Sequence, residues 1–206
     1  MTEANKLIDA ADTKIRMLKD RSQLQIKTFA KNEIIVNPSS DRYRMGFLLS
    51  GTAYLATINL DYQKRIIDYF EANDMFCNNT LCDLGNNSYY IYAKTKCTVA
   101  FMDYRDFFRE DRAALLEFQE ELLISSGRRI FQHIDILSQL TIRNKLLSYL
   151  EYCCKRSQCN SFVLPMPLSE LADYLSVDRS AMMREIGKMK DEKLLSCAGR
   201  KITLLK

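Results

Sequence analysis

The sequence predicts an α+β protein: an antiparallel β-sandwich or barrel, then one long helix, then a pair of short helices followed by a β-hairpin. Three features lead to this prediction. Short β-prone segments separated by turns cover residues 27–102, an apolar stripe at helical spacing runs through 107–140, and two short helical patterns joined by a turn occupy 168–195. A chain of 206 residues is long enough to bury a core in each of two small domains.

Composition excludes several classes of protein. Hydrophobic residues make up 47% and charged residues 27% of the chain, as in ordinary globular proteins. No apolar run approaches the roughly 18 residues of a membrane span, and the N-terminal stretch MTEANKLIDAADTK lacks the apolar core of a signal peptide. We therefore expect a cytoplasmic protein with no membrane partner.

The first half of the chain contains the candidate strands. A charged amphipathic helix is expected before them, at residues 2–21. The strands themselves are expected at 27–36, 44–51, 52–58, 65–70, 88–93 and 97–102, with turns at 37–40 and 71–74. Many short strands with regular turns are typical of antiparallel sandwiches and barrels.

The long helix carries a stripe of small and apolar residues on one side. Their spacings of three, four and seven residues match the a and d positions of a heptad repeat, which favours pairing with a second helix. Packing of the same stripe onto the helix's own domain is the alternative. The stripe consists of Ala113, Leu116, Leu123, Gly127, Ile130, Ile134 and Leu137.

The first of the two short helices is expected to start at Ser169, whose hydroxyl can cap a free backbone N–H. Glu170 then lies in the first turn, where the helix dipole favours a negative charge. Leu171, Ala172, Tyr174 and Leu175 are its apolar positions. A turn at 176–178 ends this helix, and Asp178 is placed to cap the next one.

The second short helix has two different faces. One face is apolar and consists of Met182, Ile186 and Met189. At about 100° per residue, Ser180 and Arg184 fall on the other face, with Lys188 at its edge and Arg179 at the start of the helix. A helix with an apolar back, a polar front and arginines near its start suits the major groove of DNA.

A basic hairpin follows this helix pair. Residues 194–205 read as strand, turn and strand, with Gly199 in the turn and Arg200 and Lys201 beside it, as in the wing of a winged helix. From residue 139 onward there are 12 Lys and Arg against 7 Asp and Glu, whereas the rest of the chain has 18 against 19. The positive charge is therefore concentrated in the segment expected to bind DNA phosphates.

The stretch LADYLSVDRSAMMREIGKMKDEKLL resembles the C-terminal winged helix of the Crp/Fnr family of bacterial transcription regulators. Upstream, FLLSG at 47–51 and NDMF at 73–76 are similar to landmarks of that family's effector domain, an eight-stranded jelly roll. The resemblance implies an effector domain at 1–106, a dimerisation helix at 107–139 and a DNA-binding domain at 140–206. It also implies double-stranded DNA, a second copy of the chain and RNA polymerase as partners.

The resemblance assigns roles residue by residue. Arg179, Ser180 and Arg184 match the positions that read bases, and Ser169, Lys188, Arg200 and Lys201 are candidates for phosphate contacts. Leu116, Leu123, Gly127, Ile130, Ile134 and Leu137 would form the dimer helix. A small-molecule effector would bind near Asn78, Ser88, Tyr90, Ser126 and Arg129.

The chain departs from the family where cyclic nucleotides bind. Members that bind them have Gly-Glu after the second landmark and Arg-Ser one loop later. Here the first position reads Cys77-Asn78, and the second falls within 86–89, which contains no arginine. A buried phosphate needs a cation or several backbone donors. We therefore expect an effector other than a cyclic nucleotide, and no cofactor.

The cysteines leave a second interpretation open. The seven are Cys77, Cys82, Cys97, Cys153, Cys154, Cys159 and Cys197, and none lies in the first 76 residues, where iron–sulfur members of the family carry their cluster. Their spacing does not match a strong zinc site, so most are expected to be structural. A thiol-redox switch on a DNA-binding protein is the alternative interpretation.

An enzyme is the remote alternative. A metal-dependent cupin on a jelly roll needs two or three histidines at one metal, and His133 is the only histidine here. We therefore expect no catalytic site and no metal site.

Overall fold

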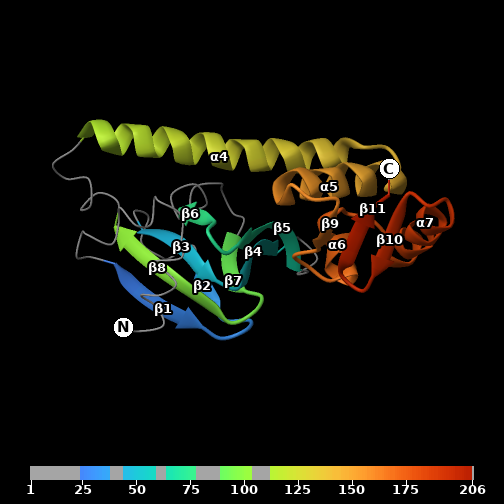
Figure 1. Ribbon diagram of the computed structural model, residues 1–206. Helices are drawn as coiled ribbons and strands as arrows, with labels where there is room; N and C mark the ends of the chain where they lie inside the picture. The colour runs from blue at the N-terminus through green and yellow to red at the C-terminus, as the bar shows by residue number, and fades with distance from the viewer. Residues whose placement is uncertain (1–23, 38–43, 59–63, 78–88, 104–111, 206) are drawn as a thin grey trace. The chain divides into compact units, whose positions relative to one another are not determined.

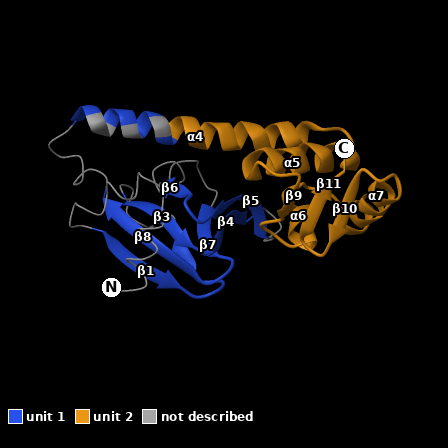
Figure 2. Cartoon of the chain, in the orientation of Figure 1, with its two compact units in different colours: residues 1–122 blue, residues 123–206 orange. Residues whose placement is uncertain are grey.

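The computed structural model describes residues 24–37, 44–58, 64–77, 89–103 and 112–205. The chain divides into two compact units, residues 1–122 and 123–206 (Figure 2). The helix expected at 2–21, together with Asn78, Cys82 and Ser88, lies outside the described residues. The predicted three-part division of the chain remains a prediction.

The first unit is a sandwich of two antiparallel sheets, with strand orders β1-β8-β3-β6 and β2-β7-β4-β5 (Figure 1). This alternation of neighbours between two sheets is that of a jelly roll. The strands are β1 (Gln25–Phe29), β2 (Ile34–Val36), β3 (Arg44–Ser50), β4 (Thr52–Ile58), β5 (Lys64–Glu71), β6 (Met75–Cys77), β7 (Tyr89–Ala93) and β8 (Cys97–Asp103).

One predicted strand is two strands in the structure. The segment 27–36 was expected to be continuous, but a turn at 30–33 divides it into β1 and β2, which pair in different sheets. Asn32 adopts a left-handed φ of 70°, and the Glu33 carboxylate accepts a hydrogen bond from the Ala30 N–H at 2.8 Å. Apolar alternation alone carries no signal for such a change of sheet.

The interior between the two sheets is filled by aromatic and aliphatic side chains. Phe76 packs at its centre, with ring centroids 5.3 Å from Phe70 and 6.3 Å from Phe101. Leu48, Ile91 and Val99 are fully buried in the same cluster. This side of the sandwich is a packed core.

The backbone conformation explains the glycine at the end of the FLLSG landmark. Gly51 links β3 to β4 with a φ of 94°, a conformation that residues with a side chain rarely adopt. A Cβ atom there would also overlap the Lys96 carbonyl oxygen and lie 2.9 Å from the Cys97 sulfur. Glycine is therefore required at this tight connection.

Two helices follow the jelly roll. Helix α4 (Arg112–Ser138) is 27 residues long, and the boundary between the two units falls inside it. Helix α5 (Ile142–Ser157) begins at Thr141, whose side chain caps it by accepting a hydrogen bond from the Asn144 N–H at 3.1 Å. The two helices thus separate at the break expected near residues 139–140. None of the described helices is both long and apolar enough to cross a membrane.

The second unit is a winged helix. Its remaining elements are β9 (Ser161–Val163), α6 (Leu168–Tyr174), α7 (Arg179–Asp191), β10 (Leu195–Ala198) and β11 (Lys201–Leu204), and the strands form one sheet in the order β10-β11-β9. Within this unit α4 contacts α6 through His133. The His133 ring stacks on the Tyr174 ring with centroids 4.0 Å apart, and its Nε2 lies 3.0 Å from the Tyr174 carbonyl oxygen.

Candidate nucleic-acid interface

Helices α6 and α7 form the helix-turn-helix expected from the sequence. Leu171, Ala172, Tyr174 and Leu175 are buried, as predicted. The turn between the helices uses Ser176 in the left-handed region, with a φ of 52°. Asp178 then caps α7, because its carboxylate accepts a hydrogen bond from the Ala181 N–H at 2.7 Å.

The predicted cap of the first helix is wrong. The cap position lies two residues earlier than expected, at Pro167, which makes no side-chain capping bond, and α6 begins at Leu168. Ser169 is therefore inside the first turn and exposed. The Glu170 and Leu171 N–H groups both donate to the Pro167 carbonyl oxygen, at 3.0 and 2.9 Å, so the first turn closes on Pro167 and not on Ser169. Glu170 lies in the first turn, as expected.

Helix α7 buries one face and exposes the other. Met182, Ile186 and Met189 are buried, whereas Arg179, Ser180, Arg184 and Lys188 are exposed. Helix α7 therefore presents its polar side to solvent as a row of two arginines, a serine and a lysine. Met183 lies within the same row and is 42% exposed, an apolar residue to which the sequence reasoning gave no role. Its position between Ser180 and Gly187 at helical spacing was the available signal.

An ion-pair cluster connects the start of α5 to α7. Arg143, at the start of α5, donates from Nη1 and Nη2 to the two carboxylate oxygens of Glu192 at 2.7 Å each, and from Nε to Glu185. These hydrogen bonds raise the pKa of Arg143 above its ordinary value, and the Arg143 hydrogen bonds lower the pKa of Glu192. No local pattern in the sequence connects Arg143 with these two carboxylates, which lie 42 and 49 residues away along the chain.

The wing is the hairpin of β10 and β11. Gly199 supplies its turn with a φ of 61°. Arg200 is tied to the strand before α6, because the Leu164 N–H donates to the Arg200 carbonyl oxygen at 2.8 Å and the Arg200 guanidinium reaches the Leu164 carbonyl oxygen at 3.5 Å. Lys201 is exposed at the start of β11. The predicted phosphate-contacting residues are thus exposed on the loop and helix ends of one winged helix.

The stripe on α4 is exposed. Leu116, Leu123, Ile130 and Ile134 are 58%, 62%, 58% and 55% exposed, although each is a large apolar residue. Gly127 has open space where a side chain would project. Ile124 and Phe131 widen this apolar surface beyond the predicted stripe. Isolated exposed leucines are common, but a helical row of this length indicates an interaction surface.

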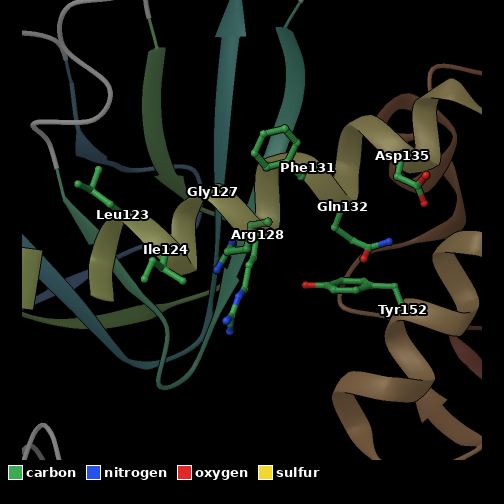
Figure 3. A pocket seen from close by; sticks show the side chains of 9 residues that line it. Leu123, Ile124, Gly127, Arg128, Phe131, Gln132, Asp135 and Tyr152 are labelled. Atoms are coloured by element: carbon green, nitrogen blue, oxygen red, sulfur yellow. The ribbon is translucent and has the colours of Figure 1, made fainter. Parts of the chain in front are cut away.

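An open groove of about 920 Å³ borders this stripe in the second unit (Figure 3). The side chains of Arg128, Gln132 and Tyr152 extend into it from α4 and α5. Arg129, predicted to be near an effector, also lines it. Sequence reasoning did not foresee the groove, because the contribution of Tyr152 depends on the packing of α5 beside α4.

The other predicted effector residues are only partly described. Tyr90 is half-buried on β7, with the Lys64 ammonium 5.5 Å from its ring centroid, and burial raises its pKa. Ser126 is half-buried on α4. Because Tyr90 belongs to the first unit and Ser126 to the second, their grouping into one pocket remains a prediction.

The described cysteines are free thiols. Cys97 and Cys153 are buried, Cys154 and Cys197 are half-buried, and Cys159 is exposed. Burial raises the pKa of the Cys97 thiol. Among the described residues, no cluster of three or more His, Cys, Asp or Glu side chains is arranged to hold a metal ion.

Comparison with known proteins identifies the fold. Residues 26–110 match the cyclic nucleotide-binding domain family. FixK2 from Bradyrhizobium japonicum has a similar structure, with a TM-score of 0.73 and 16% identity, over 89% of this chain and 93% of that chain. A CooA mutant from Carboxydothermus hydrogenoformans has a TM-score of 0.73 and 20% identity, over 93% and 86% of the two chains. No curated protein matches the sequence.

A third similar structure carries the family description. It is a putative transcriptional regulator of the Crp/Fnr family from Eubacterium rectale, with a TM-score of 0.64 and 16% identity, over 97% of this chain and 93% of that chain. This chain therefore has a cyclic-nucleotide-binding-like jelly roll and, over nearly its whole length, the fold of Crp/Fnr regulators. The predicted fold class, and the resemblance to that family at the level of the fold, are confirmed.

Proposed function

We propose that this protein is a homodimeric, sequence-specific DNA-binding transcription regulator. The exposed polar face of α7 is the single observation that carries the proposal. Arg179, Ser180 and Arg184 are exposed on one face of this helix, whereas Met182 and Met189 on the opposite face are fully buried. A helix that packs its apolar face on its own domain and exposes its arginines to solvent suits insertion into the major groove.

The chemistry of this face suits base recognition. The guanidinium of Arg184 can donate two parallel hydrogen bonds to guanine, a contact worth roughly 1–3 kcal/mol of discrimination against the wrong base. Ser180 can hydrogen-bond to any base, and Met183 beside it adds an apolar surface of the kind that contacts a thymine methyl group. We propose that these three residues, with Arg179, select the operator sequence.

Phosphate contacts would hold the protein on the duplex. Ser169 in the first turn of α6, Lys188 on α7, and Arg200 and Lys201 in the wing are exposed on the winged helix. Contacts of this kind fix the register of a protein on DNA without reading its sequence. They also make the affinity strongly dependent on salt.

The exposed stripe of α4 supports a dimer. A second copy of α4 would cover Leu123, Ile130 and Ile134 in a parallel coiled coil, with Gly127 allowing close approach of the two helices. A twofold axis along this helix gives two copies of α7, which would read two half-sites about one helical turn apart.

The jelly roll would control this dimer through an effector other than a cyclic nucleotide. The segment 78–88 contains no arginine or lysine to hold a phosphate, and the described interior between the two sheets is filled by aromatic and aliphatic side chains. Ser126 and Arg129 on α4 would report the effector to the dimer helix. Once bound, the regulator would act on RNA polymerase, a partner that the resemblance to transcription regulators supports.

Selection of bound sequences from random duplex DNA tests the proposal. The purified protein should enrich an inverted repeat whose half-site centres lie about 10 base pairs apart. The Arg179→Ala, Arg184→Ala double variant is the matched control and should enrich no sequence. Failure of the wild-type protein to enrich any sequence would contradict the proposal, and enrichment of a single half-site would contradict the dimer.

A further inference from the structure

The last turn of α5 brings two cysteines to the same loop. Gln158 ends the helix in the left-handed region, with a φ of 52°. The N–H groups of Gln158 and Cys159 both hydrogen-bond to the Cys154 carbonyl oxygen, the latter at 3.3 Å. The bond from the Cys159 N–H is the six-to-one bond of a Schellman-type helix end, which places Cys154 and Cys159 at the two ends of one turn.

The two sulfur atoms contact neighbouring residues. Cys154 Sγ donates to Asn160 Oδ1 at 3.2 Å, and the Ser161 N–H donates to Cys159 Sγ at 3.4 Å. Because Asn160 and Ser161 are adjacent, both thiols border the same short segment. Ser157 closes the loop further, since its hydroxyl reaches the carbonyl oxygens of Cys154 at 3.2 Å and Cys159 at 3.1 Å.

These two thiols differ from their neighbour Cys153. Cys153 is buried in the core of the second unit, whereas Cys154 is half-buried and Cys159 is exposed. Lys155 and Arg156 lie in the same last turn of the helix and offset the negative end of its dipole. The pair is thus open to a small oxidant from solvent, and the buried thiol is not.

We propose that Cys154 and Cys159 form a dithiol site that a hydroperoxide oxidises to a disulfide within the chain. The Cys159 thiolate attacks one peroxide oxygen. The O–O bond breaks, a sulfenic acid forms on Cys159, and the other oxygen leaves as an alcohol or water after taking up a proton. The Cys154 sulfur then attacks the Cys159 sulfur, and the sulfenic oxygen leaves as water. Two thiols and one peroxide give one disulfide, one alcohol or water, and one water.

The site is connected to the wing. The Leu204 N–H donates to the Asn160 carbonyl oxygen at 2.8 Å, and the Thr203 hydroxyl donates to Ser161 Oγ at 3.0 Å. Both partners belong to β11, the strand that starts at Lys201. The disulfide takes away the Cys154 hydrogen bond to Asn160 and so perturbs the anchor of this strand. On the basis of the proposed function, oxidation should weaken DNA binding through the wing, equally for specific and random DNA.

Peptide mass mapping after treatment with one equivalent of hydrogen peroxide tests the site. The peptide pair containing Cys154 and Cys159 should lose about 2 Da and resist alkylation until a reductant is added. The Cys153→Ser and Cys197→Ser variants should behave like the wild type. The Cys159→Ser variant should form no bond, and Gln158→Val should form it more slowly, because valine strongly disfavours a left-handed φ. A bond to Cys153 or Cys197 instead, or oxidation of Cys159 to sulfinic acid with Cys154 still free, would overturn the proposal.

The same samples test the connection to DNA. The oxidised protein should bind both specific and random duplexes roughly threefold to tenfold more weakly than the reduced protein. Its affinity should recover when a reductant is added. The affinity of the Cys159→Ser variant should not change on treatment with peroxide. Unchanged affinity with the disulfide formed would overturn the connection to the wing. Because the disulfide is detected by mass, its formation is tested even if the protein binds no DNA.

Discussion

Arg143 and Glu192 form a two-pronged ion pair across 49 residues of sequence, with two N–H···O bonds of 2.7 Å each. Arg143 starts α5, and Glu192 follows the last residue of α7. A third bond, from Arg143 Nε to Glu185, fixes the side of α7 that faces away from the exposed arginines. The Arg143 guanidinium therefore helps to orient the proposed reading helix, in addition to the buried face of α7.

Replacing Arg143 with lysine should loosen α7 while leaving the fold intact. An ammonium group cannot make the paired, planar contacts that a guanidinium makes with a carboxylate. We expect Arg143→Lys to lower affinity for the selected operator several-fold, with far-UV circular dichroism unchanged. Fluorescence anisotropy on labelled duplex measures the affinity, and Lys145→Arg on the same helix is the control. Wild-type affinity in Arg143→Lys would show that the cluster does not position α7.

The same pair predicts a dependence of stability on pH. Hydrogen bonds from Arg143 lower the pKa of Glu192 below its ordinary value of 4.5 in the folded state. The stabilisation is therefore fully present above about pH 4.5 and is lost as the pH falls through the lower folded pKa. The difference in unfolding temperature between wild type and Glu192→Gln should be positive at pH 7 and shrink towards zero in acid. A difference that grows in acid would contradict this assignment.

Loss of the α7 cap should destabilise the winged helix. Asp178→Ala removes the acceptor of the Ala181 N–H, and loss of a cap costs about 0.5–2 kcal/mol. In a chain of this size that corresponds to a fall of about 1–8 °C in unfolding temperature. Ser169→Ala is the matched control, because the structure gives Ser169 no capping bond. An equal fall for both variants would mean that Ser169 caps α6 after all.

A charge on the α4 stripe should separate the proposed dimer. Ile130→Glu places a carboxylate where two copies of the helix would meet, and burial of an unpaired charge is strongly unfavourable. Sedimentation should show a dimer for the wild type and a monomer for this variant. Ser125→Glu adds the same charge on the far side of α4 and should remain dimeric. A wild-type monomer at micromolar concentration would contradict the proposed interface.

Local patterns were enough to predict most of the architecture. The buried row of Met182, Ile186 and Met189, the capping role of Asp178 and the turn at Gly199 each follow from spacing and backbone chemistry within a few residues. The FLLSG and NDMF landmarks located the jelly roll, whose strand order no pattern of alternation encodes. Their fold-level interpretation is confirmed by the similar structures.

Contacts between distant segments could not be predicted. The pairing of Arg143 with Glu185 and Glu192, the stacking of His133 on Tyr174 and the groove beside Tyr152 all depend on how helices pack together. The Ser169 cap was wrong because α6 begins at Leu168, with Pro167, two residues before Ser169, at the cap position. The proposed pairing of Cys154 with Cys159 rests on the left-handed conformation of Gln158, to which a glutamine gives no sequence signal.

The base-reading role of Arg184 is the central claim, and a comparison of two variants on two DNAs tests it most directly. Arg184→Ala should lose roughly 5- to 150-fold in affinity for the selected operator, with little loss on a scrambled duplex. Lys201→Ala should weaken both duplexes alike and reduce the slope of log affinity against log salt by about one. Titration of both variants across salt concentrations gives all four quantities. Equal losses on operator and scrambled DNA for Arg184→Ala would contradict the account.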